Sequence, residues 1–271
     1  MRAPYPASKP PDRWERGSPY EQYMGHWSRQ LATGFLQWLD LPAGLRWLDV
    51  GCGTGALTEA ILAHAAPGRV AGIEPAQGFI DQARERLGAR AQLQRGTAEA
   101  LPLESACSDA TVAGLMLNFV PDVAAGLREM VRVTADGGTV AAYVWDYAGR
   151  MELIKYFWEA AAELDPAAAA LDEGQRFPLC RPDRLEAAFR GARLQDVTVT
   201  GIEIPTVFTD FSAYWSPFLG GQGPAPAYAM SLPPERREAL RRALQERLPA
   251  QPDGAIALVA RAWAVRGRVV R

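Results

Sequence analysis

Strands alternate with helices along the first half of this chain, and this alternation constrains its fold more than any other feature of the sequence. Short apolar runs that are typical of buried strands are each followed by segments with helical spacing of apolar residues. A strand, a helix and a second strand in succession normally form a parallel pair with the helix packed across it. In chain order, the pattern predicts strands at 46–50, 69–73, 91–94, 110–117 and 138–147, and helices at 56–65, 79–87 and 123–133.

The second half of the chain has a different pattern, with long helices and two late strands. Together with the strands above, these two complete an α/β sheet of seven strands. The additional expected elements are a helix at 23–39 before the core, helices at 151–164, 181–190 and 235–248, and strands at 197–207 and 255–265. We expect a flexible arm at 1–19 and a single domain at 20–271, with cap segments at about 20–40, 151–180 and 209–251.

Composition excludes several classes of protein. The 271 residues carry a formal net charge of −2, and 48% are hydrophobic, which is ordinary for a globular chain. No basic run suggests nucleic acid, and no apolar stretch approaches the length of a membrane span. Three widely spaced cysteines suggest neither a disulfide framework nor a zinc site. We therefore expect a cytoplasmic protein with a small-molecule partner, no nucleic-acid partner and no membrane contact, and the oligomeric state stays open.

The strongest local signal is the glycine-rich turn in WLDVGCGTGALTEAI, residues 47–61. Gly51, Gly53 and Gly55 allow a sharp turn at the end of a strand and a close approach of the backbone to a ligand. The second strand ends in GIEP, which brings Glu74 beside this turn. A carboxylate at that position can accept hydrogen bonds from both hydroxyls of a ribose. The two signals together predict a nucleoside ligand.

A nicotinamide dinucleotide is the rival ligand, because Gly51, Gly53 and Ala56 also satisfy the loose GxGxxG/A pattern. Two features favour S-adenosylmethionine (SAM) instead. Asp49 lies two residues before the first glycine, where a buried acid would repel a pyrophosphate but attract the sulfonium and ammonium of SAM. Gly55 also comes one position earlier than the dinucleotide pattern requires.

The motifs DVGCGTG, GIEP, GTAEALP and RVTADGG occur in this order over roughly residues 20–147, and in them the chain resembles the class I SAM-dependent methyltransferases. The resemblance implies a Rossmann-like α/β sheet of seven strands, mostly parallel with an antiparallel last strand pair, plus a small helical cap. It also implies that SAM is the cofactor and that the chain is an enzyme that methylates a small molecule.

The resemblance also implies roles for individual residues. Family members usually carry an acid where this chain has Thr97, so a backbone carbonyl or Glu99 would replace that acceptor. The expected cofactor-binding residues are Asp49, Gly51, Cys52, Gly53 and Gly55 at the methionine part, Glu74 and Pro75 at the ribose, Thr97, Ala98 and Glu99 at the adenine, Leu115 and Leu117 beside the methionine, and Tyr23 and Arg29 in a helical segment that folds over the cofactor.

Methyl transfer is an in-line displacement at a sulfonium, so the protein chiefly aligns the acceptor and excludes water. A base is needed only where the acceptor must lose a proton. The candidate catalytic residues are Asp146 and Tyr147, at the end of the strand AAYVWDY, and His26. We expect Tyr143, Trp145 and Tyr147 to share one face of this strand. The aromatic residues Tyr214, Trp215 and Phe218 either close over an apolar substrate as a lid or pack within the cap. No ligand set for a metal is recognisable.

Two other functions are compatible with parts of this pattern. A SAM-binding protein that transfers no methyl group, either a sensor or an enzyme that uses the sulfonium for cyclisation or another displacement, would carry the same motifs. An NAD-dependent oxidoreductase would need a catalytic set such as Tyr-x-x-x-Lys, and Lys155 has no tyrosine four residues before it.

Overall fold

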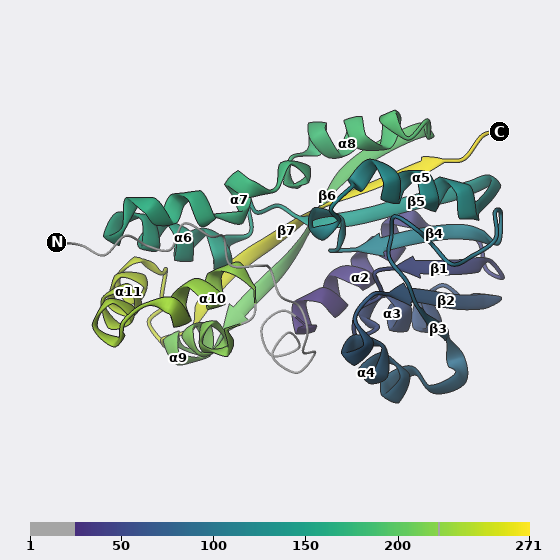
Figure 1. Cartoon of the computed structure of the whole chain (residues 1–271). Helices are drawn as coiled ribbons and strands as arrows, with labels where there is room; N and C mark the ends of the chain where they lie inside the picture. The colour runs from purple at the N-terminus through teal and green to yellow at the C-terminus, as the bar shows by residue number, and fades with distance from the viewer. Residues whose placement is uncertain (1–24, 222) are drawn as a thin grey trace.

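A seven-stranded sheet forms the centre of the computed structural model, which describes residues 25–221 and 223–271. Across the sheet the strand order is β3-β2-β1-β4-β5-β7-β6 (Figure 1). The strands are β1 (Arg46–Val50), β2 (Arg69–Glu74), β3 (Gln92–Arg95), β4 (Ser108–Gly114), β5 (Thr134–Trp145), β6 (Gln195–Phe208) and β7 (Ile256–Arg268). The expected arm at 1–19 and the cofactor-binding candidate Tyr23 lie outside the described residues.

The pairing confirms the predicted mixed sheet. Strands β1 to β5 pair in parallel, whereas β7 runs antiparallel to both β5 and β6. The order reverses between β1 and β4, because β2 and β3 continue on one side of β1 and β5 continues on the far side of β4. Ligands of open α/β sheets bind in the crevice at the carboxyl ends of the strands at such a switch point.

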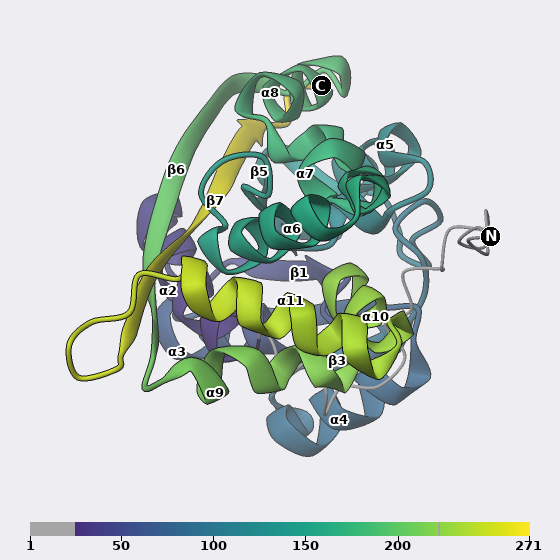
Figure 2. The ribbon, with the colours of Figure 1, turned by 90° about the vertical axis from the view of Figure 1, so that its left-hand side faces the viewer.

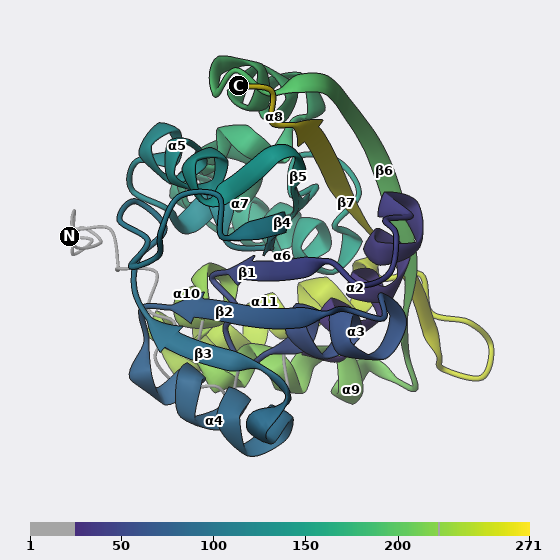
Figure 3. The same ribbon diagram turned by 90° about the vertical axis from the view of Figure 1, so that its right-hand side faces the viewer.

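Helices cover both faces of the sheet, and the alternation of side chains along β5 shows how. Tyr143 and Trp145 pack into the core beneath α2 (His26–Leu39), α3 (Ala56–His64) and α4 (Gln77–Leu87). Val144 and Ala142 point to the other face, where α5 (Val123–Val133) and α8 (Pro182–Gly191) pack. Figure 3 shows the strands edge to edge between these two groups of helices. The period of two along a strand therefore decides which β5 residues share a core.

Several strand boundaries differ from the predicted ones, and two of the differences have a clear local reason. The strand expected at 110–117 ends at Gly114, because Leu115 has a φ of 62° and leaves the extended region. The turn expected before the strand at 138–147 lies inside β5, which begins at Thr134 and shifts its register against β4. Gly137, with a φ of 74°, allows this bulge without breaking the strand.

A helical cap is built from α6 (Glu152–Leu164), α7 (Glu173–Arg176), α9 (Phe211–Trp215), α10 (Pro224–Ser231) and α11 (Pro234–Arg247) (Figures 1 and 2). Its interior is aromatic: the ring of Phe157 on α6 stacks on that of Phe218 at 4.6 Å, and the Tyr214 hydroxyl donates to the Leu153 carbonyl over 3.0 Å. Tyr214 and Phe218 are therefore core residues of the cap, so of the two roles that the sequence left open for them the structure favours packing over a lid. The sequence predicted α6 and α11 but not the short helices α7, α9 and α10.

Within the part of the chain that the structure describes, no helix is long and apolar enough to cross a membrane.

Candidate functional site

A cavity of about 570 Å³ opens at the carboxyl ends of β1, β2, β4 and β5. Ligand-binding pockets commonly have volumes of a few hundred to about 1,000 Å³. One half of its wall comes from the glycine turn after β1 and the ends of β2 and β3. The other half comes from the segments after β4 and β5 and from the cap residues Ile154, Glu173 and Pro224. The switch point of the sheet and the cap thus enclose one continuous space.

The glycine turn is fixed by bonds between β1 and β2. The backbone amides of Gly51 and Cys52 both donate to the Ile73 carbonyl, at 2.7 and 3.1 Å. Gly51 has a φ of 69°, and a Cβ there would lie 2.7 Å from Cγ of Met116. Gly53 also has a positive φ of 54°, but a Cβ there would meet no atom within 4 Å. Gly51 is therefore required by packing, whereas Gly53 keeps open the space that a ligand would fill.

Asp49, at the end of β1, is a fully buried carboxyl group that lines the cavity. The Thr58 hydroxyl donates to its Oδ2 over 2.6 Å, whereas its Oδ1 has no hydrogen-bond partner among the described residues. Burial raises the pKa of Asp49 to about 7, and the neighbouring Glu74 adds to the increase. A buried acid with an unpaired oxygen is costly unless a ligand completes its partners.

Glu74, at the end of β2, faces the same part of the cavity and is 6% exposed. Its Oε2 accepts a hydrogen bond from the Gly53 amide over 3.1 Å, and its Oε1 accepts one from the Ala76 amide over 2.9 Å. Burial raises the pKa of Glu74, and these two backbone bonds oppose the increase. The bonds orient the carboxylate and leave lone pairs for further donors.

These residues fit the cofactor that the sequence resemblance implies. SAM carries a positive sulfonium and a positive ammonium, and each would relieve the cost of the buried Asp49 carboxylate. The oriented carboxylate of Glu74 can accept bonds from the two ribose hydroxyls, as expected. The unpartnered Oδ1 of Asp49 is the observation in this structure that calls for such a cation.

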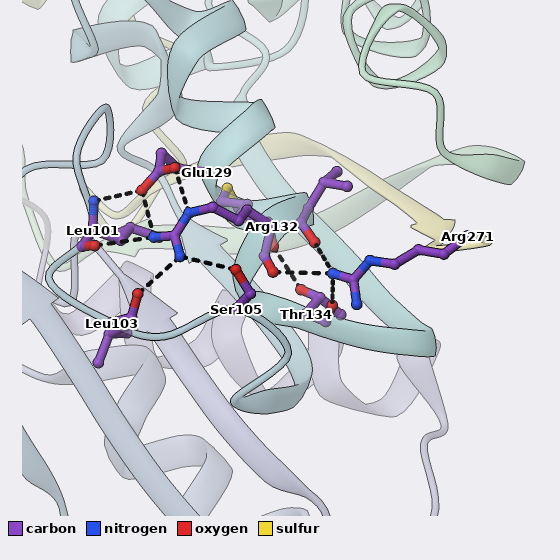
Figure 4. Close-up of polar contacts among 9 residues, drawn as sticks. Leu101, Leu103, Ser105, Glu129, Arg132, Thr134 and Arg271 are labelled. Atoms are coloured by element: carbon purple, nitrogen blue, oxygen red, sulfur yellow. Dashed lines mark hydrogen bonds and ion pairs between the residues drawn. The ribbon is translucent and has the colours of Figure 1, made fainter.

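Beyond β3, the residues expected at the adenine, Thr97, Ala98 and Glu99, line the cavity together. The loop that follows them is tied to α5 by Arg132, whose guanidinium pairs with Glu129 and donates to the carbonyls of Leu101 and Leu103 (Figure 4). The Glu129 carboxylate in turn accepts a bond from the Leu101 amide, over 2.9 Å. The RVTADGG motif therefore has a structural role, because its arginine, Arg132, holds this wall of the cavity in place.

The structure brings most of the predicted site residues together. The cofactor-binding candidates in the cavity wall are Asp49, Gly51, Cys52, Gly53, Glu74, Pro75, Thr97, Ala98, Glu99 and Leu115, and they are joined by the catalytic candidate Tyr147. Gly55, with a φ of 90°, is instead the N-cap of α3, and Leu117 is fully buried in the core under α5. Neither of these two residues is part of the wall.

The N-terminal helix contributes to the cavity through a residue other than the predicted ones. Ser28 of α2 lines the cavity, whereas His26 is exposed and lies edge-on to Trp27, with ring centres 4.8 Å apart. Arg29 is half-buried and is not part of the wall.

Asp146 is not brought into the cavity, although it is only 2% exposed. Its Oδ2 lies 2.7 Å from Nη2 of Arg261 and accepts a bond from the Arg150 amide over 3.0 Å. Its neighbours Trp145 and Tyr147 do line the cavity, because successive strand residues point to opposite faces. The carboxylate that sequence pattern suggested as a base is thus engaged in an ion pair on the other side of the strand end.

Sequence reasoning missed Glu173, a carboxyl group that the cap places in the cavity wall. It is 2% exposed, and the Trp158 indole N–H donates to its Oε2. Burial raises the pKa of Glu173 to about 8. The sequence around it, LDEGQRF, has no pattern that distinguishes this glutamate from a solvated one.

Among the described residues, no group of three or more histidine, cysteine, aspartate or glutamate side chains is arranged to hold a metal ion.

Comparison with known proteins points to the same part of the chain. Residues 48–142 match a family model described as a methyltransferase domain. The chain is 34% identical over 121 residues to a 2-phytyl-1,4-naphtoquinone methyltransferase of Thermosynechococcus vestitus, a match that covers 44% of this chain and 52% of that protein. The chain therefore spans about half the length of this curated relative.

Solved structures share the fold over nearly the whole chain. A putative methyltransferase from an antibiotic biosynthesis pathway of Anabaena variabilis superposes with a TM-score of 0.60 and 20% identity, covering 87% of this chain and 96% of that one. The [4+2]-cyclase SpnF superposes with a TM-score of 0.54 and 19% identity, covering 90% of this chain and 82% of that one. At these identities the likeness concerns the fold alone, and one fold can host different reactions.

Proposed function

We propose that this chain, whose residues 48–142 belong to the methyltransferase-domain family, is a SAM-dependent methyltransferase that acts on a small-molecule acceptor. The family match covers the segment that builds the cofactor half of the cavity, from β1 to β5. The name of the relative described above, with its naphthoquinone, supports a small apolar acceptor.

The observation that carries the proposal is the unpartnered Oδ1 of the fully buried Asp49, beside the oriented carboxylate of Glu74. The charge of Glu74 disfavours the ionised form of Asp49, and the sulfonium and ammonium of SAM would relieve that cost. A dinucleotide would bring a negatively charged pyrophosphate to the same position.

When bound, SAM supplies a methyl group on a positively charged sulfur, and the chain's residues prepare the site for its transfer. Asp49 would balance the positive charge at the methionine part, and Glu74 would fix the ribose. The apolar residues Leu115, Trp145 and Ile154 in the wall would keep water away from the methyl group.

The remaining assignments belong to the same proposal. Thr97, Ala98 and Glu99 would hold the adenine, and α2 would close over the cofactor near Ser28, with Arg29 and His26 at its edge. We propose a metal-independent reaction, an acceptor other than nucleic acid, and a cytoplasmic location. The free thiols of Cys52, Cys107 and Cys180 are compatible with a reducing compartment.

Parallel calorimetric titrations with SAM, S-adenosylhomocysteine and NADH test the cofactor assignment. We expect micromolar binding of the first two ligands and none of NADH; the reverse would refute the proposal. Product analysis then separates methyl transfer, which leaves S-adenosylhomocysteine, from attack on the aminobutyl carbon, which leaves methylthioadenosine. A sensor would leave SAM intact.

A further inference from the structure

Among the described residues, the half of the cavity that lies under the cap has one carboxyl group in its wall. Asp49, Glu74 and Glu99 line the half built by the ends of β1, β2 and β3, whereas Glu173 belongs to α7 in the cap. Around it the wall is formed by the side chains of Tyr143, Trp145, Tyr147, Ile154 and Pro224. Glu173 is therefore an isolated acid in an otherwise apolar and aromatic chamber.

Three contacts fix the position of Glu173. Asp172 caps α7 by accepting a bond from the Gly174 amide over 2.8 Å. Gly174 lies so close to the end of β5 that a Cβ there would be 2.7 Å from the Tyr147 carbonyl oxygen. The indole of Trp158, on α6, donates to Oε2 of Glu173. The carboxyl group is thus held against the segment after β5 before any ligand binds.

An aromatic bridge links this position to the cofactor half of the cavity. The ring of Phe177, which follows α7, lies 5.9 Å from that of Tyr147 and 5.2 Å from that of Phe119. Phe119 and Tyr147 both line the cavity, after β4 and β5 respectively. Glu173 therefore lines the same cavity as the residues of the cofactor half, and Phe177 joins its helix to two other wall residues.

The charge environment suits an exchangeable proton. Burial raises the pKa of Glu173 to about 8; the field of Asp172 raises it further, and the Trp158 bond and the field of Arg176 oppose the rise. The other titratable groups of the wall are Asp49, Cys52, Glu74, Glu99, Tyr143 and Tyr147. A base is most effective when its pKa lies near the working pH, and a phenol with a pKa of about 10 lies within reach of this one.

We infer that Glu173 binds the acceptor and takes its proton, and that the acceptor is a neutral molecule with an apolar ring system and an ionisable hydroxyl group. The inference rests on the proposed function. A neutral hydroxyl enters an apolar chamber at a lower cost than an ammonium, which would also be repelled by the positive charges of SAM. It also donates a stronger hydrogen bond to a carboxylate than a neutral aromatic amine such as 2-naphthylamine does, because a phenol is the much stronger acid. In the step, the hydroxyl oxygen forms a bond to the methyl carbon as the sulfur–methyl bond breaks. The sulfur keeps that electron pair, and the hydroxyl proton passes to the Glu173 carboxylate and then to solvent.

The test uses the full chain and two matched probes, 2-naphthol and 2-naphthylamine. Their binding is measured by calorimetry in the presence of S-adenosylhomocysteine, for the unmodified protein, Glu173→Gln and the control Glu152→Gln. Glu152 is a partly buried carboxylate on α6 that accepts a bond from the Val259 amide outside the cavity wall. We expect 2-naphthol to bind more tightly than the amine, and Glu173→Gln to weaken it by about tenfold or more, while the control stays within about twofold.

Turnover and its pH profile provide a second readout. Glu173→Gln should lower kcat/KM for 2-naphthol methylation by about 100-fold and remove the ascending limb of the profile. Trp158→Phe keeps the carboxyl group but removes its donor, so the ascending limb should move upward by about half a pH unit or more.

Several outcomes would overturn this inference: no binding of 2-naphthol to the unmodified protein, preference for 2-naphthylamine, an unchanged pH profile in Glu173→Gln, or loss of turnover in Asp146→Asn alone. Failure of the proposed function is distinguishable, because the unmodified protein would then either not bind SAM or bind it without forming S-adenosylhomocysteine. If SAM binds and Glu173→Gln changes nothing, only the acceptor assignment fails.

Discussion

The two halves of the cavity hold their carboxyl groups by different means. In the cofactor half, Asp49 and Glu74 lie at the ends of β1 and β2, and the backbone amides of Gly53 and Ala76 orient Glu74. In the acceptor half, Glu173 stands on a helix of four residues and is held by Trp158 from a helix elsewhere in the chain. Strand ends of a parallel sheet form a site through local sequence, whereas the cap site depends on the packing of separate segments.

The comparison predicts that substitutions in the two halves have separable effects, and the largest concerns Glu74. Glu74→Ala should weaken SAM by about 100-fold or more, because two hydrogen bonds to a charged acceptor contribute about 3 kcal/mol. Calorimetric titration with SAM measures this loss. Glu85→Ala, on the exposed face of α4, serves as a control. Normal SAM affinity in the Glu74 variant would contradict the assignment of SAM to the half of the cavity that contains Glu74.

The glycine turn offers a matched pair within the cofactor half. Gly51→Ala combines a positive φ with a close contact to Met116 and should cost about 2–3 kcal/mol of unfolding free energy. Gly53→Ala has the same kind of backbone strain without a contact, so about 1 kcal/mol is expected. Urea unfolding followed by circular dichroism measures both values. Equal losses of unfolding free energy in the two variants would mean that the Met116 side chain moves and makes room for the added methyl group.

In the half of the cavity under the cap, the raised pKa of Glu173 should make the free energy of unfolding depend on pH. Because the folded protein raises the pKa of Glu173 from 4.5 to about 8, it keeps a proton that the unfolded chain releases. The associated stability is present at low pH and is lost as pH rises through about 8. Between about pH 6 and about pH 9, the free energy of unfolding of the unmodified protein should therefore fall by about 2 kcal/mol relative to that of Glu173→Gln.

Asp49 contributes a stability loss of the same sign as pH rises toward 7, but it is present in both proteins and cancels in this comparison. Thermal or urea unfolding at both pH values provides the data. A stability difference that does not change with pH would show that Glu173 holds no proton in the folded state.

In the cofactor half, pH should act on binding. Burial raises the pKa of Asp49 to about 7 in the free protein, and a cationic ligand favours its ionised form. SAM affinity should therefore fall by about tenfold per pH unit below about 7, with proton release on binding. Titrations in buffers with different ionisation enthalpies measure both effects. Asp49→Asn should bind weakly with a flat pH profile, and a sloping profile in that variant would assign the proton to another group.

The smallest effect is expected from metal removal. SAM affinity and turnover should stay within about twofold in EDTA, because the described residues contain no cluster of metal-ligating side chains. A loss that Mg²⁺ restores would indicate that a metal acts in one of the two halves.

The first half of the chain was the more predictable one. The helix at 123–133 and the strand at 46–50 were predicted with the bounds that the structure has. Errors occurred where one residue left the extended region, as at Leu115, or where a glycine was absorbed into a strand as a bulge, as at Gly137. In the cap, the short helices α7 and α10 carry too few residues for a periodic pattern to emerge.

The sequence by itself determined the sheet, the glycine turn and the partnership of Asp49 with Glu74, because these depend on neighbours in the chain and on strands that follow one another. Only the tertiary structure decided which partners Asp146 and Glu173 have and which of the two reaches the cavity. Asp146 is turned into an ion pair with Arg261 of β7, and Glu173 is brought to the cavity by contacts with Trp158 and with the end of β5. Both outcomes follow from partners distant in the chain, whose approach depends on side-chain packing that no local pattern encodes.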